Sequence, residues 1–393
     1  MTERIYLDWN ATAPLRPAAR AAMLAALDHV GNASSVHAEG RAARHLVEAA
    51  REQVAALVGA QAGNVVFTSG GTEANMQALS PAIECPRDRG SLNGLLASAV
   101  EHASVRSGGR FAPNAVEEIP VTSDGIVDLA WLKERLEELY RRGRRQLVSI
   151  MHANNETGVV QPIAAAARIV ASVDGLLHVD AVQTAGRIPC DIKVLGANLL
   201  TISGHKLGGP QGSGALVKAS EGFQLDDPLI KGGGQERGSR AGTENVPAIA
   251  GFGAAARAAR EALIADGARL AALRGRLEAG LREIAAGTVI FGERVERLPN
   301  TTLFAVPGLK AQTALMALDL AGVAVSSGSA CSSGKVAASH VLNAMGAAPD
   351  LAGGAIRVSL GWETRETEVE DFLIAWSKTV SRLSRGKKTG LAA

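Results

Sequence analysis

One lysine stands out because of the residues on either side of it. Lys206 closes the sequence Ser-Gly-His-Lys at residues 203–206, directly after a short apolar run, and the glycine-rich segment LGGPQGSG follows it. Glycines let a ligand approach the backbone closely, because they have no Cβ. A lysine drawn into such a cleft loses hydration, its pKa falls, and its amine can form a Schiff base with an aldehyde. Taken alone, the segment is explained more simply by a solvated lysine in a turn.

Two further segments contain groups that could bind an aldehyde ligand with a ring nitrogen and a phosphate. Asp180 ends the apolar run LLHVD, and its carboxylate could pair with a protonated ring nitrogen or cap the next helix. Gln183 follows at a spacing suited to reaching a ring hydroxyl. The segment TSGGTEAN, at residues 68–75, has the pattern of a strand, a glycine-rich turn and a helix start. Backbone N–H groups at such a helix start attract a phosphate.

These segments together predict a site for pyridoxal 5'-phosphate (PLP). Gly71 and Thr72 would contact the phosphate, and Ser203 and His205 could add side-chain donors. Each signal is weak by itself. Because the signals lie at different strand ends and suit different parts of one cofactor, they are strong together.

A second reactive group is predicted at Cys331. It lies among small residues and glycines in SSGSACSSG, at residues 326–334, which indicates an exposed segment rather than an apolar core. Cys85 and Cys190 have apolar or proline neighbours and are predicted to be structural. An accessible thiol in a PLP enzyme could travel to a bound substrate and act as a nucleophile.

The elements that must position these residues follow from apolar runs that alternate with helical patterns. Strands are predicted at residues 64–69, 146–152, 176–180, 198–203 and 214–218, and helices between them at 72–83 and 163–170. This alternation predicts an α/β fold with a mostly parallel sheet. A helical stretch at 248–285, with a break near Gly267, leads into an α+β module. Its predicted strands are 301–305, 323–326 and 355–360, and its predicted helices are 311–321, 337–344 and 366–383.

Length and composition exclude several classes of protein. The chain of 393 residues carries 41 Lys and Arg against 39 Asp and Glu. This balance argues against nucleic acid or a membrane surface as the main partner. No apolar run reaches membrane-spanning length, and the N-terminus does not have the pattern of a secretory signal. Three cysteines cannot form a disulfide framework, so we expect a cytoplasmic location.

The whole set of segments resembles the NifS/IscS group of cysteine desulfurases, within the class V aminotransferase-like enzymes of PLP fold type I. The most specific parts are MHANNETG, HVDAVQTAG, SGHKLGGPQG, GGGQERGSRAGTENV and SSGSACSSG. The resemblance implies a large PLP-binding domain at residues 15–260, with a mostly parallel seven-stranded sheet. It also implies a small α+β domain, made of residues 1–14 and 261–393, that carries the cysteine loop at about 326–337.

For the cofactor, the resemblance implies several kinds of contact. Lys206 would form the Schiff base, and His102 would stack on the ring and act as a catalytic residue together with Lys206 and Cys331. Asp180 would pair with the ring nitrogen and Gln183 with the ring hydroxyl, with Asn155 nearby. The phosphate would be held by Gly71, Thr72, Ser203, His205 and, from the second subunit of a homodimer, Thr243.

For the reaction, the resemblance implies L-cysteine as substrate and L-alanine as product. Asn155 and Arg357 would bind the substrate carboxylate, and Lys206 would remove the Cα proton. Cys331 would take the sulfur as a persulfide and pass it to an acceptor protein such as an iron–sulfur cluster scaffold. No metal site is expected, although Cys331 could contact a cluster during that transfer.

Other functions are compatible with parts of this pattern. A selenocysteine lyase would use the same cofactor residues, and so would an aminotransferase of class V. Cys331 argues against the aminotransferase, which has no use for a thiol. A catalytically silent scaffold is the third alternative, and the complete set of cofactor residues argues against it.

Departures from the group's pattern fall outside the residues assigned to chemistry. Trp9 stands where Asn or Tyr is usual, Ala13 where Thr is usual, and Ala33 where Pro is usual. Residues 336–338, Val-Ala-Ala, replace a common Leu-Glu-Pro after the cysteine. The last departure leaves loop dynamics and acceptor docking open.

Overall fold

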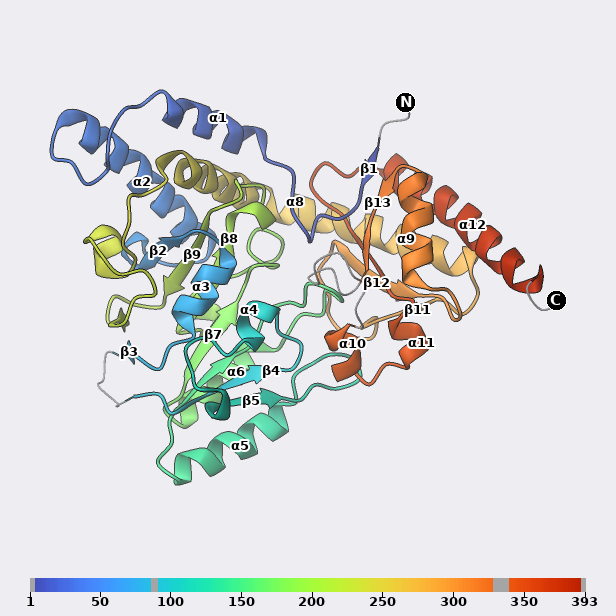
Figure 1. The fold of residues 1–393 in the computed structure, drawn as a ribbon, viewed down its shortest axis with the longest axis horizontal. Coiled ribbons are helices and arrows are strands. Elements are labelled where there is room, and N and C mark those ends of the chain that lie inside the picture. The colour runs from blue at the N-terminus through green and yellow to red at the C-terminus, as the bar shows by residue number, and fades with distance from the viewer. Residues whose placement is uncertain (1–3, 86–90, 328–338, 390–393) are drawn as a thin grey trace.

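The computed structural model describes residues 4–85, 91–327 and 339–389, and of residues 384–389 only the backbone. A seven-stranded sheet forms the centre of the larger part of the molecule (Figure 1). From edge to edge its strands are β2 (Val65–Thr68), β9 (Gly214–Lys218), β8 (Leu199–Ser203), β7 (Leu176–Asp180), β6 (Gln146–Ser149), β4 (Gly94–Ser98) and β5 (Val116–Ile119). All of them run parallel except β9, which is antiparallel to both neighbours. This confirms the mostly parallel sheet that was predicted.

Helices cover both faces of this sheet. Along β8, Leu200 and Ile202 face one apolar core and Leu199 faces the other. The first core is completed by α2 (Ala38–Leu57), α5 (Leu129–Arg141) and α6 (Ile163–Ser172), and the second by α3 (Gly71–Ala78) and α4 (Ala103–Arg106). Because both faces are buried, the inner strands are mainly apolar, whereas the edge strand β5, with the sequence Val-Glu-Glu-Ile, is partly exposed. The helix predicted at 72–83 ends at Ala78, since Pro81 disfavours helical backbone in the residues before it.

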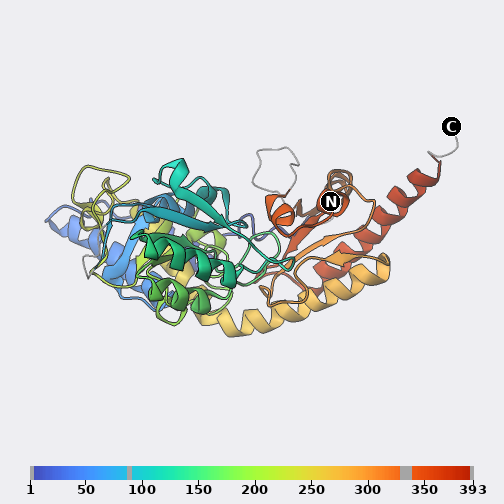
Figure 2. The same ribbon diagram turned by 90° about the horizontal axis from the view of Figure 1, so that it is seen from below.

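One helix joins the two parts of the molecule. α8 (Val246–Ile284) is continuous over 39 residues and runs along both parts (Figure 2). The break predicted near Gly267 is therefore wrong. A glycine costs a helix only about 1 kcal/mol relative to alanine, which the packing of α8 on both sides of this position offsets. The boundary predicted between residues 260 and 261 falls inside α8, and the division into two domains stays a prediction.

The smaller part is built on a four-stranded antiparallel sheet, in the order β11 (Val289–Ile290), β12 (Thr301–Ala305), β15 (Ile356–Ser359) and β14 (Ser326–Ser327). Its core includes side chains from α9 (Ala311–Leu320), α12 (Glu366–Thr389) and the second half of α8. The strand predicted at 323–326 is divided between β14 and β13 (Val323–Ala324), and β13 pairs with β1 (Ile5–Tyr6) from the N-terminus.

Several elements were not predicted from the sequence. They are α1 (Pro17–Leu27), α2, α4, α5, β1, β4, β5, β11, the short pair β3 (Ile83–Glu84) and β10 (Gln224–Leu225), α7 (Ile192–Leu195) and α11 (Pro349–Ala352). The helix predicted at 337–344 is α10 (His340–Ala344), and residues 337–338 lie outside the described part. None of the helices in the described ranges combines the length and hydropathy that crossing a bilayer requires.

The continuity of α8 can be tested with two glycines of the same helix. A Cβ added at Gly267 would meet only the carbonyl oxygen of Arg187, at 3.9 Å, so Gly267→Ala should stabilise the protein by about 1 kcal/mol. At Gly253 the Cβ would lie 2.5 Å from Ala50 Cα, so Gly253→Ala should destabilise it by about 1–3 kcal/mol. Calorimetric Tm values should move in opposite directions. A lower Tm for Gly267→Ala would mean that the helix does break there.

Candidate active site

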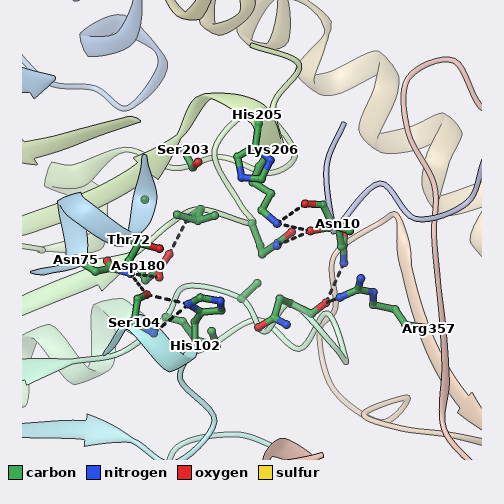
Figure 3. Close-up of a pocket in the computed structure, with 17 residues that line it drawn as sticks. Asn10, Thr72, Asn75, His102, Ser104, Asp180, Ser203, His205, Lys206 and Arg357 are labelled. Atoms are coloured by element: carbon green, nitrogen blue, oxygen red, sulfur yellow. Dashed lines mark hydrogen bonds between the residues drawn. The ribbon is translucent and has the colours of Figure 1, made fainter. Parts of the chain in front are cut away.

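Side chains from the carboxyl ends of five strands of the large sheet, β2, β4, β6, β7 and β8, meet at one cavity of about 300 Å³ (Figure 3). Ten of the residues predicted for the site line it: Gly71, Thr72, His102, Asn155, Asp180, Gln183, Ser203, His205, Lys206 and Arg357. Parallel strands end at the same edge, which brings these segments together although they are far apart in the chain.

Two predicted residues are not placed in this cavity. Thr243 is exposed and is not among the lining residues, so its role toward a second subunit stays a prediction. Cys331 falls within residues 328–338, outside the described residues. The other two cysteines can be described: Cys190 is buried, and burial raises the pKa of its thiol to about 12. Cys85 is half-buried, with the Arg145 guanidinium 3.0 Å from its sulfur.

Lys206 ends a short 3-10 turn, Gly204–Lys206, that follows β8. Its Nζ donates to the backbone oxygens of Asn10 and Ala11, both at 2.7 Å. The same oxygen of Asn10 accepts from Gln183 Nε2 at 3.1 Å. The N-terminal segment therefore forms one wall of the site, and Asn10 is a site residue that the sequence reasoning missed.

The side chain of Gln183 is oriented by a second missed residue, Arg187. The guanidinium of Arg187 donates to Gln183 Oε1, to Asn10 Oδ1 at 2.9 Å and to the backbone oxygen of Lys206 at 3.1 Å. Because Gln183 Oε1 accepts from Arg187, the Nε2 end of the Gln183 amide is the end that donates to Asn10. Burial, and then the charge of Arg357, lower the pKa of Arg187 to about 9.

Asp180 lies at the end of β7 and accepts two hydrogen bonds. One comes from the backbone N–H of Val182 at 2.9 Å, and the other from Asn75 Nδ2, on α3, at 2.8 Å. Beside it lies Glu101, which is fully buried and accepts from the backbone N–H of Met151. Burial, and then the charge of Asp180, raise the pKa of Glu101 well above its ordinary value.

The end of the cavity beside α3 is suited to an anion. A Cβ on Gly71 would lie 2.9 Å from Val182 Cγ2 and 3.3 Å from Ser203 Cβ, so a side chain would not fit there. The backbone N–H groups in the first turn of a helix have no partner within the helix. His205 Nδ1 lies 3.1 Å from Thr12 Oγ1, and burial, then Lys206 and Arg187, lower the pKa of His205 to about 4. The imidazole is thus neutral in this structure.

The opposite end is formed by Arg357 on β15, which is 2% exposed. Its Nη1 donates to the backbone oxygen of Asn155 at 2.9 Å, and its Nη2 to Asp8 Oδ1 at 2.7 Å. Asp8 Oδ2 in turn accepts from Ser326 Oγ at 2.9 Å. Among the described residues, the buried Nε atom of Arg357 has no hydrogen-bond partner, so the guanidinium is held in place and still has a donor that a carboxylate could use.

The raised pKa of Glu101 can be tested by the pH dependence of stability. The pKa of Glu101 is raised in the folded state, so the folded protein holds this proton more tightly than the unfolded chain does. The free energy of unfolding of the wild-type protein therefore has its full value below the unfolded pKa of Glu101 and decreases as pH rises through the folded pKa. Glu101→Gln is neutral at every pH, so its Tm relative to wild type should rise from pH 5 to pH 8. The gain should approach about 1.4 kcal/mol per pH unit in that window. The exposed control Glu283→Gln should show no such trend. A flat difference for Glu101→Gln would show that Glu101 is charged.

Comparison with known proteins identifies the family. The aminotransferase class-V model matches residues 5–372. A cysteine desulfurase of Cereibacter sphaeroides is 41% identical over 388 residues, covering 97% of each chain. The structure of a NifS-like protein from Rickettsia africae matches with a TM-score of 0.86 at 37% identity, covering 96% of this chain and 100% of the other. SspA in complex with cysteine matches with a TM-score of 0.76 at 28% identity, covering 90% and 98%. The chain therefore belongs to the aminotransferase class-V family.

Proposed function

We propose that this protein is a PLP-dependent cysteine desulfurase, which takes sulfur from L-cysteine and releases L-alanine. The observation that carries the proposal is the convergence of Lys206, Asp180 and Arg357 on one cavity. An amine, an acceptor carboxylate and a free guanidinium donor are the groups that an amino acid substrate and a pyridine cofactor need. The similarity to cysteine desulfurases over nearly the whole chain supports the choice of reaction within the family.

The residues of the cavity fit PLP. Gly71, Thr72, Ser203 and His205 line the end of the cavity beside the start of α3, where a phosphate would bind. Asp180 would take the ring nitrogen, Gln183 the ring hydroxyl, and Lys206 would hold the aldehyde carbon. When bound, PLP withdraws electrons from the Cα atom of an attached amino acid and so makes its proton acidic.

The residues of this chain would then perform the remaining tasks. Arg357 would bind the substrate carboxylate through its planar guanidinium, and the Lys206 amine would accept the Cα proton. The Cys331 thiolate would attack the substrate sulfur, so that a sulfur–sulfur bond forms as the Cβ–sulfur bond breaks. The electron pair of the broken bond stays with carbon, which is protonated and leaves as L-alanine.

The partners are proposed with the same reaction. A homodimer would bring Thr243 to the phosphate of the neighbouring site, and the loop that carries it is tied to the start of α3 by Arg240 Nε and Glu73 Oε1, 2.9 Å apart. The persulfide on Cys331 would be passed in the cytoplasm to an acceptor protein, such as an iron–sulfur cluster scaffold. These assignments rest on the resemblance and on the exposure of Thr243.

The place of the cofactor is tested by chemical fixation. Borohydride makes the attachment of PLP to a lysine permanent, and we expect peptide mapping to locate the label on Lys206 alone. Lys206→Ala should lose the label, whereas the exposed control Lys310→Ala should keep it. A label on any other lysine of the wild-type protein would refute the assignment.

The role of the thiol is tested by product analysis. Cys331→Ala should still bind PLP and L-cysteine, but its rate of alanine formation should fall about a hundredfold or more, because a methyl group cannot accept sulfur. Cys85→Ala and Cys190→Ala serve as controls that should keep alanine formation. Mass spectrometry of the wild-type protein after one turnover should find the extra sulfur on Cys331. Alanine formation by Cys331→Ala at the wild-type rate would contradict the desulfurase mechanism.

A further inference from the structure

A line of hydrogen bonds connects Asp180 to His102 (Figure 3). Asn75 Nδ2 donates to Asp180 Oδ2 at 2.8 Å and to Ser104 Oγ at 2.9 Å. Ser104 Oγ lies 2.8 Å from His102 Nδ1, and the backbone N–H of Ser104 donates to the same nitrogen at 3.2 Å. Asn75 and Ser104 are both buried, at 1% and 8% exposure. Neither residue has a role in the proposed reaction described above.

The direction of each bond in this line follows from the one before it. An ionised carboxylate can only accept, so the amide of Asn75 must present its NH2 group to Asp180. The second hydrogen of that NH2 group is donated to Ser104 Oγ. The hydroxyl hydrogen of Ser104 is then directed to His102 Nδ1, which must accept it with its lone pair. A neutral imidazole that accepts at Nδ1 carries its proton on Nε2.

We propose that Ser104 and Asn75 are positioning residues, which hold the imidazole of His102 in the tautomer with the proton on Nε2. The backbone N–H of Ser104 supports the same tautomer, and the hydroxyl supplies the shorter of the two contacts. The acceptor charge of Asp180 thereby determines where the proton of His102 lies, although the two side chains are not in direct contact.

The consequence is a fixed proton donor at the cavity. Nδ1 faces Ser104 and the first turn of α4, and the ring of His102 lines the cavity (Figure 3). A group that contacts Nε2 therefore meets an N–H and not a lone pair. What this proton does in the reaction rests on the proposed function, but the tautomer itself depends only on residues of this chain.

The experiment separates the tautomer from the activity. Nitrogen-15 NMR of histidine-labelled protein without cofactor reports which ring nitrogen of His102 is protonated, with the His102 signals assigned from the spectrum of His102→Asn. We expect the Nε2–H form in wild type, with an Nδ1 resonance typical of a hydrogen-bonded acceptor. In Ser104→Ala the Nδ1 resonance should move toward that of an acceptor without a strong donor. In Ser104→Thr, which keeps the hydroxyl, it should return to the wild-type position.

A matched control removes a different hydroxyl, at the end of the same helix, α4. Ser107, at the end of α4, donates to the backbone oxygen of Ser104 and is exposed, so Ser107→Ala should leave the His102 resonances unchanged. In the protein with PLP, Ser104→Ala should lower kcat for alanine formation about tenfold and shift the acid side of the pH profile, and Ser104→Thr should restore both.

The outcomes distinguish the two proposals. An unchanged Nδ1 resonance in Ser104→Ala, or an Nδ1–H form in wild type, would overturn the proposed positioning whatever the enzyme does. The expected NMR pattern in a protein that forms no alanine from L-cysteine would support the positioning and refute the desulfurase function.

Discussion

The carboxylate of Asp180 is the constraint on which the rest of the site depends. It lies at the end of β7, in the middle of the large sheet, and is 5% exposed. A buried carboxylate is costly unless donors surround it, and here a backbone N–H and the amide of Asn75 supply them. Beside this carboxylate, burial and then the charge of Asp180 raise the pKa of Glu101. In the proposed function, the carboxylate of Asp180 is the group that would face the ring nitrogen of the cofactor.

The remaining groups are held by contacts between the two parts of the molecule. Arg357 belongs to the smaller sheet, yet it donates to the backbone of Asn155 in the larger part and to Asp8 near the N-terminus. Asn10 bridges in the same way, since its Nδ2 donates to the backbone of Asn155 and to Thr301 Oγ1. The end of the cavity beside Arg357 therefore exists only when the N-terminal segment and both parts are assembled.

Trp9, which the resemblance to the NifS/IscS group marks as a departure, is accommodated by contacts close to it in the structure. Its ring is 4% exposed and meets Trp362 edge-to-face, with the ring centroids 4.6 Å apart. A Cβ on Gly361 would lie 1.9 Å from the Trp9 ring, so the larger side chain fits because glycine stands there. The guanidinium of Arg16 covers the other tryptophan, 3.8 Å from its ring centroid. The residue after Trp9, Asn10, accepts a hydrogen bond from Lys206 Nζ at its backbone oxygen, at 2.7 Å.

The residues at strand ends could be predicted from the sequence, and the residues that orient them could not. Lys206, Asp180 and Gly71 follow recognisable apolar runs, and parallel topology brings such ends together. Asn75, Ser104 and Arg187 lie within a turn of predicted residues, in or beside the same motifs. Their roles depend on partners far along the chain, however, such as Asn75 on Asp180 across 105 residues. The prediction of a break in α8 was wrong for a related reason: tertiary packing on both sides of Gly267 outweighs the low helix propensity of a single glycine.

The charge of Asp180 is tested most directly on the cofactor itself. PLP labelled with nitrogen-15 in its ring can be bound to the wild-type protein and to Asp180→Asn, and the ring nitrogen observed by NMR. The account predicts a protonated ring nitrogen in wild type and an unprotonated one in Asp180→Asn, with PLP still attached to Lys206 in both. An unprotonated nitrogen in wild type, or the same resonance in the two proteins, would contradict the placement of the cofactor against Asp180.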